Sequence, residues 1–224
     1  MVKNNLLSPG QFAIDHFPRF GLTQYADKYS TQSSPLDILI SGDVEDKIRL
    51  AEKDLDPLTR IEQTSDFHCV TTWTRQNLLW SGYRFKDFYQ KIILPNVRPS
   101  NKANYVIFRS QDGFRSILPL SDLLADEVLL ADRLDGEPLS AKHGAPLRLV
   151  TPAHYGYKST KHLTTIEFWP DESKFHPPMY RFMSHPRARV EFEERGLWFP
   201  GWFLRYLYRP QIKSTIKLFE ETMK

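Results

Sequence analysis

The chain has 224 residues, of which 41% are hydrophobic and 25% charged, and its formal net charge is +3. This length suits one domain, or one domain with a short appendage, and so small a net charge does not indicate a nucleic-acid partner. No apolar run reaches the roughly 18 residues needed to span a bilayer. The 16 prolines and the 13% of aromatic residues favour many strands and turns over a helical bundle.

The N-terminal stretch from Met1 to Pro9 contains neither a hydrophobic signal core nor a pair of arginines. As written, this end predicts a cytoplasmic protein, although a processed chain would look the same. The next segment, Gln11 to Tyr25, mixes aromatic and polar residues without a regular period. It predicts an extended arm packed on the domain.

Short strands and one helix are expected in the first half of the domain. Residues 38–40 predict a strand, and residues 47–58 a strand followed by a helical turn. Residues 66–74 predict a further strand, because β-branched and aromatic side chains dominate there. From Phe85, apolar residues recur at i, i+3, i+4, i+7 and i+8, which predicts an amphipathic helix that ends before Pro95.

The second half of the domain continues the mixture of strands and helices. Residues 105–108 predict a strand followed by a turn at 111–113, and Ser121 is expected to cap a helix. Residues 147–150 and 163–168 predict two more strands. Because the spacing is not that of regular βαβ units and no dinucleotide-binding fingerprint is present, the expected class is α+β.

The composition changes at the C-terminal end. We therefore expect residues 1–170 to form one domain and residues 171–224 an extension packed on it. Residues 198–208 combine aromatic side chains with Arg205, and Arg209 follows directly. A tail wrapped over the domain is the simpler interpretation. The alternative is a docking surface for a partner protein or a membrane interface, since aromatic and arginine side chains suit both.

The only cysteine of the chain, Cys69, lies in one of the predicted strands. One thiol excludes an intramolecular disulfide and a cysteine-based structural zinc site. Alternation along the strand places Phe67, Cys69 and Thr71 on one face and His68 on the other, where it is expected to pack. A lone cysteine on a strand is most often a small buried hydrophobe.

Three motifs give Cys69 a second interpretation. Phe-His-Cys-Val-Thr surrounds Cys69, Lys-His-Gly-Ala-Pro-Leu-Arg spans 142–148, and Gly-Tyr-Lys-Ser-Thr-Lys spans 156–161. In order, spacing and chemistry they resemble the molybdopterin-binding domain of the sulfite oxidase family, near its small bacterial branch with the methionine-sulfoxide reductase catalytic subunit. The resemblance runs from about residue 12 to residue 168. It implies a mixed, β-rich molybdopterin-binding fold with peripheral helices.

The same resemblance implies a cofactor, molybdopterin with molybdenum, and the residues that hold it. Cys69 would be the single protein ligand of the metal, since a thiolate is a soft ligand that a high-valent metal keeps deprotonated. Arginine and lysine suit the phosphate of the cofactor, arginine as a fork and lysine as a point charge. The positions implied to bind the pterin and its phosphate are His16, Arg19, Ser110, His143, Arg148, Ser159, Thr160 and Lys161.

One position departs from the family pattern. Sulfite oxidases carry a tyrosine in the loop where this chain has Phe114, and a phenyl ring cannot donate a hydrogen bond to a sulfur oxyanion. Arg115 follows and is the candidate that would still supply a catalytic charge. Reduction of a sulfoxide or N-oxide is therefore preferred over oxidation of sulfite.

The expected activity is a two-electron oxygen-atom transfer to or from a small-molecule substrate. Nothing in the sequence predicts a flavin, haem or iron–sulfur site, and a single cysteine excludes an all-cysteine cluster. A separate electron donor or acceptor protein is therefore expected. Two other classes stay open: a molybdopterin-binding module without turnover, and an interaction domain in which Cys69 only packs.

Overall fold

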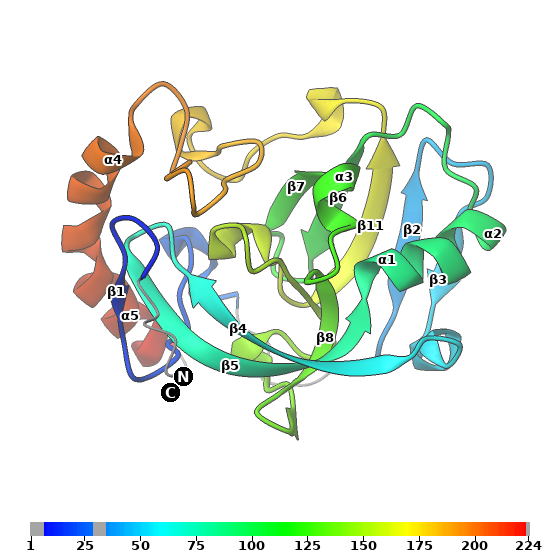
Figure 1. Ribbon diagram of the computed structural model, residues 1–224, viewed down its shortest axis with the longest axis horizontal. Coiled ribbons are helices and arrows are strands. Elements are labelled where there is room, and N and C mark those ends of the chain that lie inside the picture. The colour runs from blue at the N-terminus through cyan, green and yellow to red at the C-terminus, as the bar shows by residue number, and fades with distance from the viewer. Residues whose placement is uncertain (1–6, 29–34, 223–224) are drawn as a thin grey trace, which may run out of the picture.

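Two β-sheets carry the described part of this computed structural model, residues 7–28 and 35–222 (Figure 1). The six-stranded first sheet has the order β1-β5-β8-β10, with β4 paired to β5 and β9 to β8. Its strands are β1 Phe12–Ala13, β4 Arg60–His68, β5 Trp73–Arg84, β8 Leu129–Leu134, β9 Glu137–Pro138 and β10 Arg148–Val150. The five-stranded second sheet has the order β3-β2-β11-β6-β7. Its strands are β2 Ile38–Gly42, β3 Ile48–Leu50, β6 Tyr105–Ser110, β7 Arg115–Pro119 and β11 Leu163–Trp169.

The helices are short and lie at the periphery. They are α1 Phe85–Phe88, α2 Leu94–Asn96, α3 Leu120–Leu123, α4 Gly201–Tyr208 and α5 Ile212–Glu221. A π-helical segment, η3 Tyr89–Ile93, joins α1 to α2, and short 3-10 turns cover Thr23–Tyr25, Glu52–Leu55, Ala141–His143, Gly156–Lys158, Glu172–Lys174, Arg181–Met183 and Arg209–Gln211. Figure 1 places α4 and α5 beside β1, at the opposite end of the molecule from α1 and α2. The expected α+β class, β-rich with peripheral helices, is confirmed.

One large apolar core joins the two sheets. Ile40 and Phe108 of the second sheet pack in the same cluster as Leu130 and Leu149 of the first sheet, and all four are fully buried. Full burial of such a side chain stabilises the fold by about 1.5–3 kcal/mol. The α1–η3 segment covers this core through Phe85 and its apolar neighbours, which is why its helical periodicity is so clear in the sequence.

The long strand β5 can bend because of one glycine. A β-bulge between Ser81 and Gly82 shifts the register of β5 on β8. A Cβ atom added at Gly82 would lie 2.2 Å from the carbonyl oxygen of Leu130. Only glycine therefore permits this approach of the two backbones.

Three local predictions are wrong. The strand expected over residues 66–74 is interrupted, because β4 ends at His68 and the chain turns before β5 begins. The helix from Phe85 does not end before Pro95, since the wider π segment relieves the clash that a proline ring makes with the preceding turn. Ser121 does not cap α3, because that helix already begins at the preceding residue.

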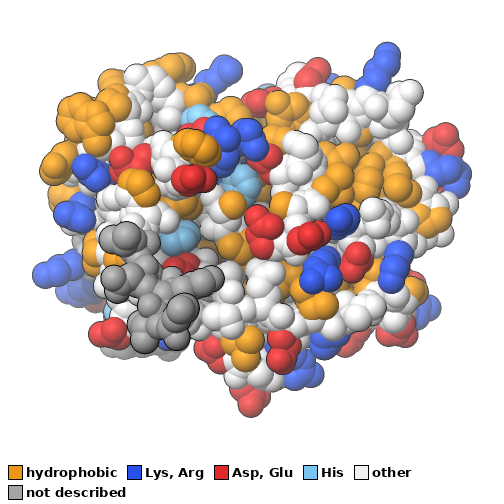
Figure 2. Space-filling view, viewed as in Figure 1, with side chains coloured by type: hydrophobic (Ala, Val, Ile, Leu, Met, Phe, Trp, Pro, Cys, Tyr) orange, Lys and Arg blue, Asp and Glu red, His pale blue; other side chains and the backbone are white. Residues whose placement is uncertain are grey.

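The C-terminal extension forms two helices with one buried and one exposed side. Leu204 and Tyr208 of α4 are buried, whereas Trp202, Phe203 and Tyr206 are exposed. Figure 2 shows hydrophobic side chains gathered at the left edge of this face, over α4. In residues 7–28 and 35–222, no helix has the length and apolar character needed to cross a membrane. The division at residue 170 stays a prediction.

Candidate active site

Cys69 begins a tight turn that links β4 to β5. The amide of Cys69 donates to the carbonyl of Trp73 at 2.8 Å, and the amide of Thr72 donates to the carbonyl of Cys69 at 3.1 Å. Thr72 has a φ of 101°, an unusual conformation for a β-branched residue. Backbone strain of this kind persists only where the surroundings hold the turn in place.

Segments distant in the sequence hold this turn. The side chain of Gln11 donates to the carbonyl of Cys69 at 3.2 Å, and that of Arg195 donates to the carbonyl of Val70 at 2.6 Å. The amide of Phe12, in β1, donates to the carbonyl of Thr72 at 2.9 Å. The N-terminal arm and the C-terminal extension thus both fix the position of the thiol.

The thiol of Cys69 is buried but reaches a cavity. Its Sγ lies 3.1 Å from Oγ1 of Thr71, and 7% of the residue is exposed. Burial raises the pKa of the Cys69 thiol to about 11, and the Thr71 hydrogen bonds and the charge of Arg195 offset only part of that rise. The thiol is therefore protonated at neutral pH, unless a bound metal ion displaces the proton.

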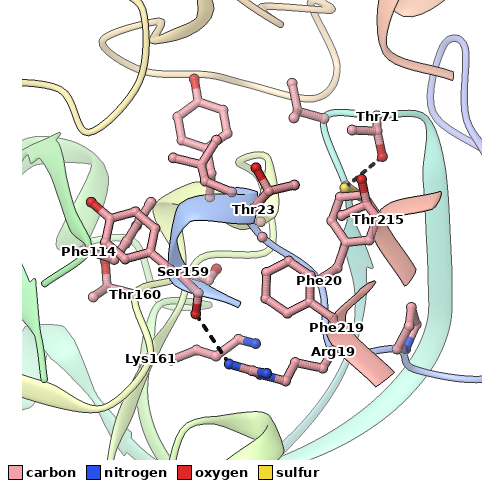
Figure 3. Close-up of a pocket in the computed structure, with 18 of the residues that line it drawn as sticks. Arg19, Phe20, Thr23, Thr71, Phe114, Ser159, Thr160, Lys161, Thr215 and Phe219 are labelled. Carbon is pink, nitrogen blue, oxygen red and sulfur yellow. Dashed lines mark hydrogen bonds between the residues drawn. The ribbon is translucent and has the colours of Figure 1, made fainter. Parts of the chain in front are cut away.

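A cavity of about 240 Å³ opens beside the thiol, with walls from both sheets, the N-terminal arm and the C-terminal helices (Figure 3). Six of the predicted site residues line it together: Arg19, Cys69, Ser110, Ser159, Thr160 and Lys161. His143 and Arg148 do not line the cavity, but each contacts a residue that does: His143 stacks on Phe17, and Arg148 lies over the ring of Phe67. His16 and Arg115 do not line the cavity.

Three cations approach one another at one end of the cavity. In Figure 3 the amine of Lys161 and the guanidinium of Arg19 lie together below the aromatic residues. Burial, and then the charges of Arg148 and Arg19, lower the pKa of Lys161 to about 7. Within residues 7–28 and 35–222, neither Lys161 nor Arg148 forms an ion pair with a carboxylate. Such a cluster is unfavourable alone and suits a phosphate group.

Arg148 joins the two predicted cofactor loops. Its side chain is fully buried and donates to the carbonyls of His143 at 2.9 Å and Ser159 at 3.2 Å. The guanidinium carbon lies 4.9 Å from the centre of the Trp80 ring and 5.5 Å from that of the Phe67 ring. Burial lowers the pKa of Arg148 to about 9, so the side chain is still cationic at neutral pH.

His143 presents a neutral ring with a spare hydrogen-bonding atom. The ring stacks on Phe17 with centroids 4.6 Å apart, and its Nδ1 is buried without a partner among the described residues. Burial, with the charges of Lys161 and Arg148, lowers the pKa of His143 to about 3. A neutral imidazole offers one donor and one acceptor, which suits the edge of a pterin.

The predicted hydroxyl residues differ in what they can contact. Oγ of Ser110 is buried and has no partner in the described structure. Oγ of Ser159 already bonds to Thr151, and Oγ1 of Thr160 lies 2.6 Å from Oγ of Ser116. Ser110 is therefore free to bind a ligand, whereas the hydroxyls of Ser159 and Thr160 already have partners within the protein.

Gly144 keeps the two cofactor loops close together. Its φ is 108°, and an added Cβ would lie 2.9 Å from Cβ of Lys161 and 3.2 Å from Cβ of Arg148. Any other residue would push these cations apart. Sterics therefore explain why a glycine stands in the His-Gly-Ala-Pro motif.

Two predicted residues lie elsewhere. The side chain of His16 is exposed, and the next residue, Phe17, lines the cavity in its place. Arg115 begins β7 opposite Arg109, and Phe114 lines the cavity in its place. The roles predicted for His16 and Arg115 thus stay predictions, without support from the cavity geometry.

Several residues of the C-terminal extension also belong to the site. Arg195 holds the Cys69 turn, and Tyr208, Thr215 and Phe219 line the cavity. No motif marks them. The aromatic and apolar spacing of residues 202–219 was the one available signal, and it indicates burial rather than a particular contact.

The side chains gathered at this cavity fit the molybdopterin cofactor that the motifs imply. One thiol is available for a metal, three cations for a phosphate, and Ser110 Oγ and His143 Nδ1 for a heterocyclic edge. No group of three or more His, Cys, Asp or Glu side chains comes together in the described ranges to form a metal site of protein ligands alone. Fold and site together define a molybdopterin-dependent oxidoreductase.

Comparison with known proteins identifies the family. Residues 28–176 match the model of the oxidoreductase molybdopterin binding domain, so the chain belongs to this family. It is 36% identical over 140 residues to the uncharacterized oxidoreductase YuiH of Bacillus subtilis, covering 62% of this chain and 68% of the relative. It is 28% identical over 215 residues to the protein-methionine-sulfoxide reductase catalytic subunit MsrP of Campylobacter jejuni, covering 83% and 69%.

A solved structure shows the same fold. The sulfane dehydrogenase SoxCD from Paracoccus pantotrophus superposes with a TM-score of 0.55 at 20% identity. The match covers 68% of this chain and 43% of that one. At this identity the likeness concerns the fold alone. The family match and the relatives establish an enzyme whose cofactor is molybdopterin with molybdenum.

Proposed function

We propose that this protein reduces a neutral sulfoxide, of the kind found in methionine sulfoxide, to the thioether. The S=O bond breaks, sulfur gains two electrons, and the oxygen leaves as water with two protons. The proposal depends chiefly on the apolar lining of the cavity beside Cys69. The cavity wall includes the aromatic rings of Phe20, Phe114 and Phe219 and the thioethers of Met179 and Met183. Aromatic rings and thioethers suit a neutral sulfur compound with a methyl group.

The cavity is less suited to binding an anionic substrate. Phe114 offers no hydrogen bond where sulfite oxidases have a tyrosine, and Arg115 does not line the cavity. Three cations line it: Arg19 and Lys161 lie at the end assigned to the cofactor phosphate, and the amine of Lys28 lies 5.1 Å from the centre of the Tyr25 ring. Sulfite oxidation is therefore not favoured.

Different residues of the chain would hold different parts of the cofactor. Arg148, Lys161 and Arg19 would hold the phosphate, and Ser110 and His143 the pterin edge, which leaves Cys69 as the metal ligand. When bound, the cofactor supplies the two-electron oxygen-atom transfer. The protein orients the substrate sulfur toward the Cys69 end, and the aromatic lining excludes water from it.

The relatives support both the substrate class and an electron partner. Several carry the name protein-methionine-sulfoxide reductase catalytic subunit, including those of Campylobacter jejuni and Pseudomonas syringae. We propose that a separate electron-transfer protein supplies the two electrons here. Docking of that protein or of a membrane on the exposed aromatic residues of α4 stays a prediction.

The cytoplasmic location also stays a prediction. It depends on Met1–Pro9, and residues 1–6 of that stretch lie outside the described residues. Cell fractionation with an antibody against the protein would check it.

The activity test uses protein made in a host that synthesises the cofactor. Reduced benzyl viologen serves as electron donor, with methionine sulfoxide and dimethyl sulfoxide as substrates. Sulfite oxidation is measured in parallel with ferricyanide as acceptor. The proposal expects viologen oxidation that depends on sulfoxide and little sulfite oxidation. Sulfite turnover without sulfoxide turnover would overturn it.

A further inference from the structure

The wall of the cavity opposite the cofactor motifs comes from outside the family domain. The family match ends at residue 176, yet Tyr208, Thr215 and Phe219 all line the cavity. They belong to α4 and α5, which Figure 1 places against β1 and the β4–β5 hairpin. The matched domain carries Cys69 and the motifs at 142–148 and 156–161, whereas this wall belongs to the C-terminal extension.

Helix α5 begins in the buried cluster that contains Cys69. Ile212, its first residue, packs in the same buried cluster as Cys69 and Trp73. Thr215, one turn later, is 8% exposed and makes no hydrogen bond with its hydroxyl to any described residue. Thr215 lines the same cavity as Cys69 and Thr71, and Figure 3 draws it on the same side of the cavity as Thr71. A hydroxyl of α5 is therefore available in the wall of the cavity that contains Cys69.

A second hydroxyl stands on the same wall. Tyr208 is 5% exposed, and its Oη has no hydrogen-bond partner in residues 7–28 and 35–222. Burial raises the pKa of Tyr208 to about 12, although the charge of Arg195 offsets part of the rise. The phenol thus keeps its proton and acts as a donor. A buried donor without a partner costs free energy, which a ligand acceptor would recover.

We propose that Thr215 and Tyr208 bind the substrate by donating hydrogen bonds to the oxygen of a neutral sulfoxide, so that the α4–α5 wall determines substrate specificity. This inference rests on the sulfoxide reduction proposed above. Two hydroxyls on the C-terminal wall replace the function that Phe114 cannot perform.

The chemistry of substrate and product explains the selectivity. A sulfoxide oxygen is a strong hydrogen-bond acceptor, whereas the sulfur of the thioether product is a weak one. The two hydroxyls therefore hold the substrate and lose their partner once the oxygen has left, which favours product release. A site built around such donors also discriminates against ligands that lack the acceptor.

The test measures binding and turnover separately. Variants Thr215→Val and Tyr208→Phe each remove one hydroxyl at nearly constant shape, and Thr215→Ser retains it. Ser214→Ala is the matched control, since Ser214 is exposed on the same helix and bonds only to the carbonyl of Gln211. Binding of methionine sulfoxide to the oxidised holoenzyme, without electron donor, is followed by ligand-observed NMR. Melting temperatures establish that every variant is folded.

Each removed hydroxyl is expected to weaken sulfoxide binding and raise KM about tenfold. Thr215→Ser should recover most of the loss, Ser214→Ala should match the parent, and binding of the thioether should not change. Parental affinity in both Thr215→Val and Tyr208→Phe, in an enzyme that still reduces sulfoxides, would overturn this inference alone. A parent enzyme that neither binds nor reduces sulfoxides would overturn the proposed function and this inference with it.

Discussion

The guanidinium of Arg195 donates a 2.6 Å hydrogen bond to the carbonyl of Val70, the residue after Cys69. Arg195 is fully buried, donates also to the carbonyl of Pro9, and pairs with Glu193 at 3.3 Å. A charge from the C-terminal extension thus reaches through the interior to the turn that presents the thiol. The extension is part of the site rather than a cover over it.

Replacing Arg195 should therefore loosen both the fold and the site. Arg195→Met removes the donors of two backbone carbonyls and one of the two arginines that pair with Glu193. We expect a loss of about 3 kcal/mol in the free energy of unfolding, measured with urea. Arg205→Met is the control, because Arg205 lies 3.5 Å from the same carboxylate but is partly exposed, and it should cost under about 1 kcal/mol. Equal effects of the two variants would contradict this role.

Without its cofactor, the protein should become more stable as the pH rises from 7 to 9. Burial lowers the pKa of both Lys158 and Lys161 from the ordinary 10.5 to about 7. In this window the unfolded chain binds protons that the folded chain has released, so stability rises by up to about 1.4 kcal/mol per pH unit for each lysine. Above pH 9 the buried Cys69 thiol acts in the opposite direction, because its folded pKa is raised to about 11.

The variant Lys161→Met measures how much Lys161 contributes to the rise of stability with pH. Without cofactor, the Lys161→Met variant should keep only the part of this pH dependence of stability that Lys158 supplies. When it is made in a host that synthesises the cofactor, the variant should retain less molybdopterin than the parent. Lys213→Met, on the exposed side of α5, is the control. Melting temperatures at several pH values and pterin fluorescence are the measurements. An unchanged slope together with full pterin content would show that Lys161 lies outside the site.

Gly144→Ala should separate the two cofactor loops. The new Cβ would meet the side-chain carbons of Lys161 and Arg148, and the φ of 108° is strained for alanine. We expect a loss of about 1–3 kcal/mol and a lower pterin content. Gly136→Ala is the comparison, since its φ is 83° but nothing lies within 4 Å of the added atom. Equal pterin content in the two variants would contradict the packing argument.

The sequence predicted the cofactor end of the site better than the substrate end. Arg148 and Lys161 belong to contiguous motifs whose residue types match the charge of a phosphate, so their convergence could be expected. The turn at Cys69 was missed because Val70, Thr71 and Thr72 all favour strands, and tertiary hydrogen bonds override that preference.

The C-terminal wall was not predictable in the same way. Thr215 and Tyr208 reach the cavity through long-range packing of α4 and α5, and local periodicity carries no information about such packing. His16 shows the converse limit. Its position in the arm matched the motif order, but the backbone turns its neighbour Phe17 inward instead.

The most direct test of the account is the molybdenum and pterin content of the parent protein and of Cys69→Ser, made in the same cofactor-competent host. We expect about one molybdenum per chain in the parent. In Cys69→Ser we expect retained pterin, held by Arg148 and Lys161, with molybdenum lost or its absorption spectrum altered. A folded parent without molybdenum or pterin, or a Cys69→Ser variant with unchanged metal content and spectrum, would contradict it.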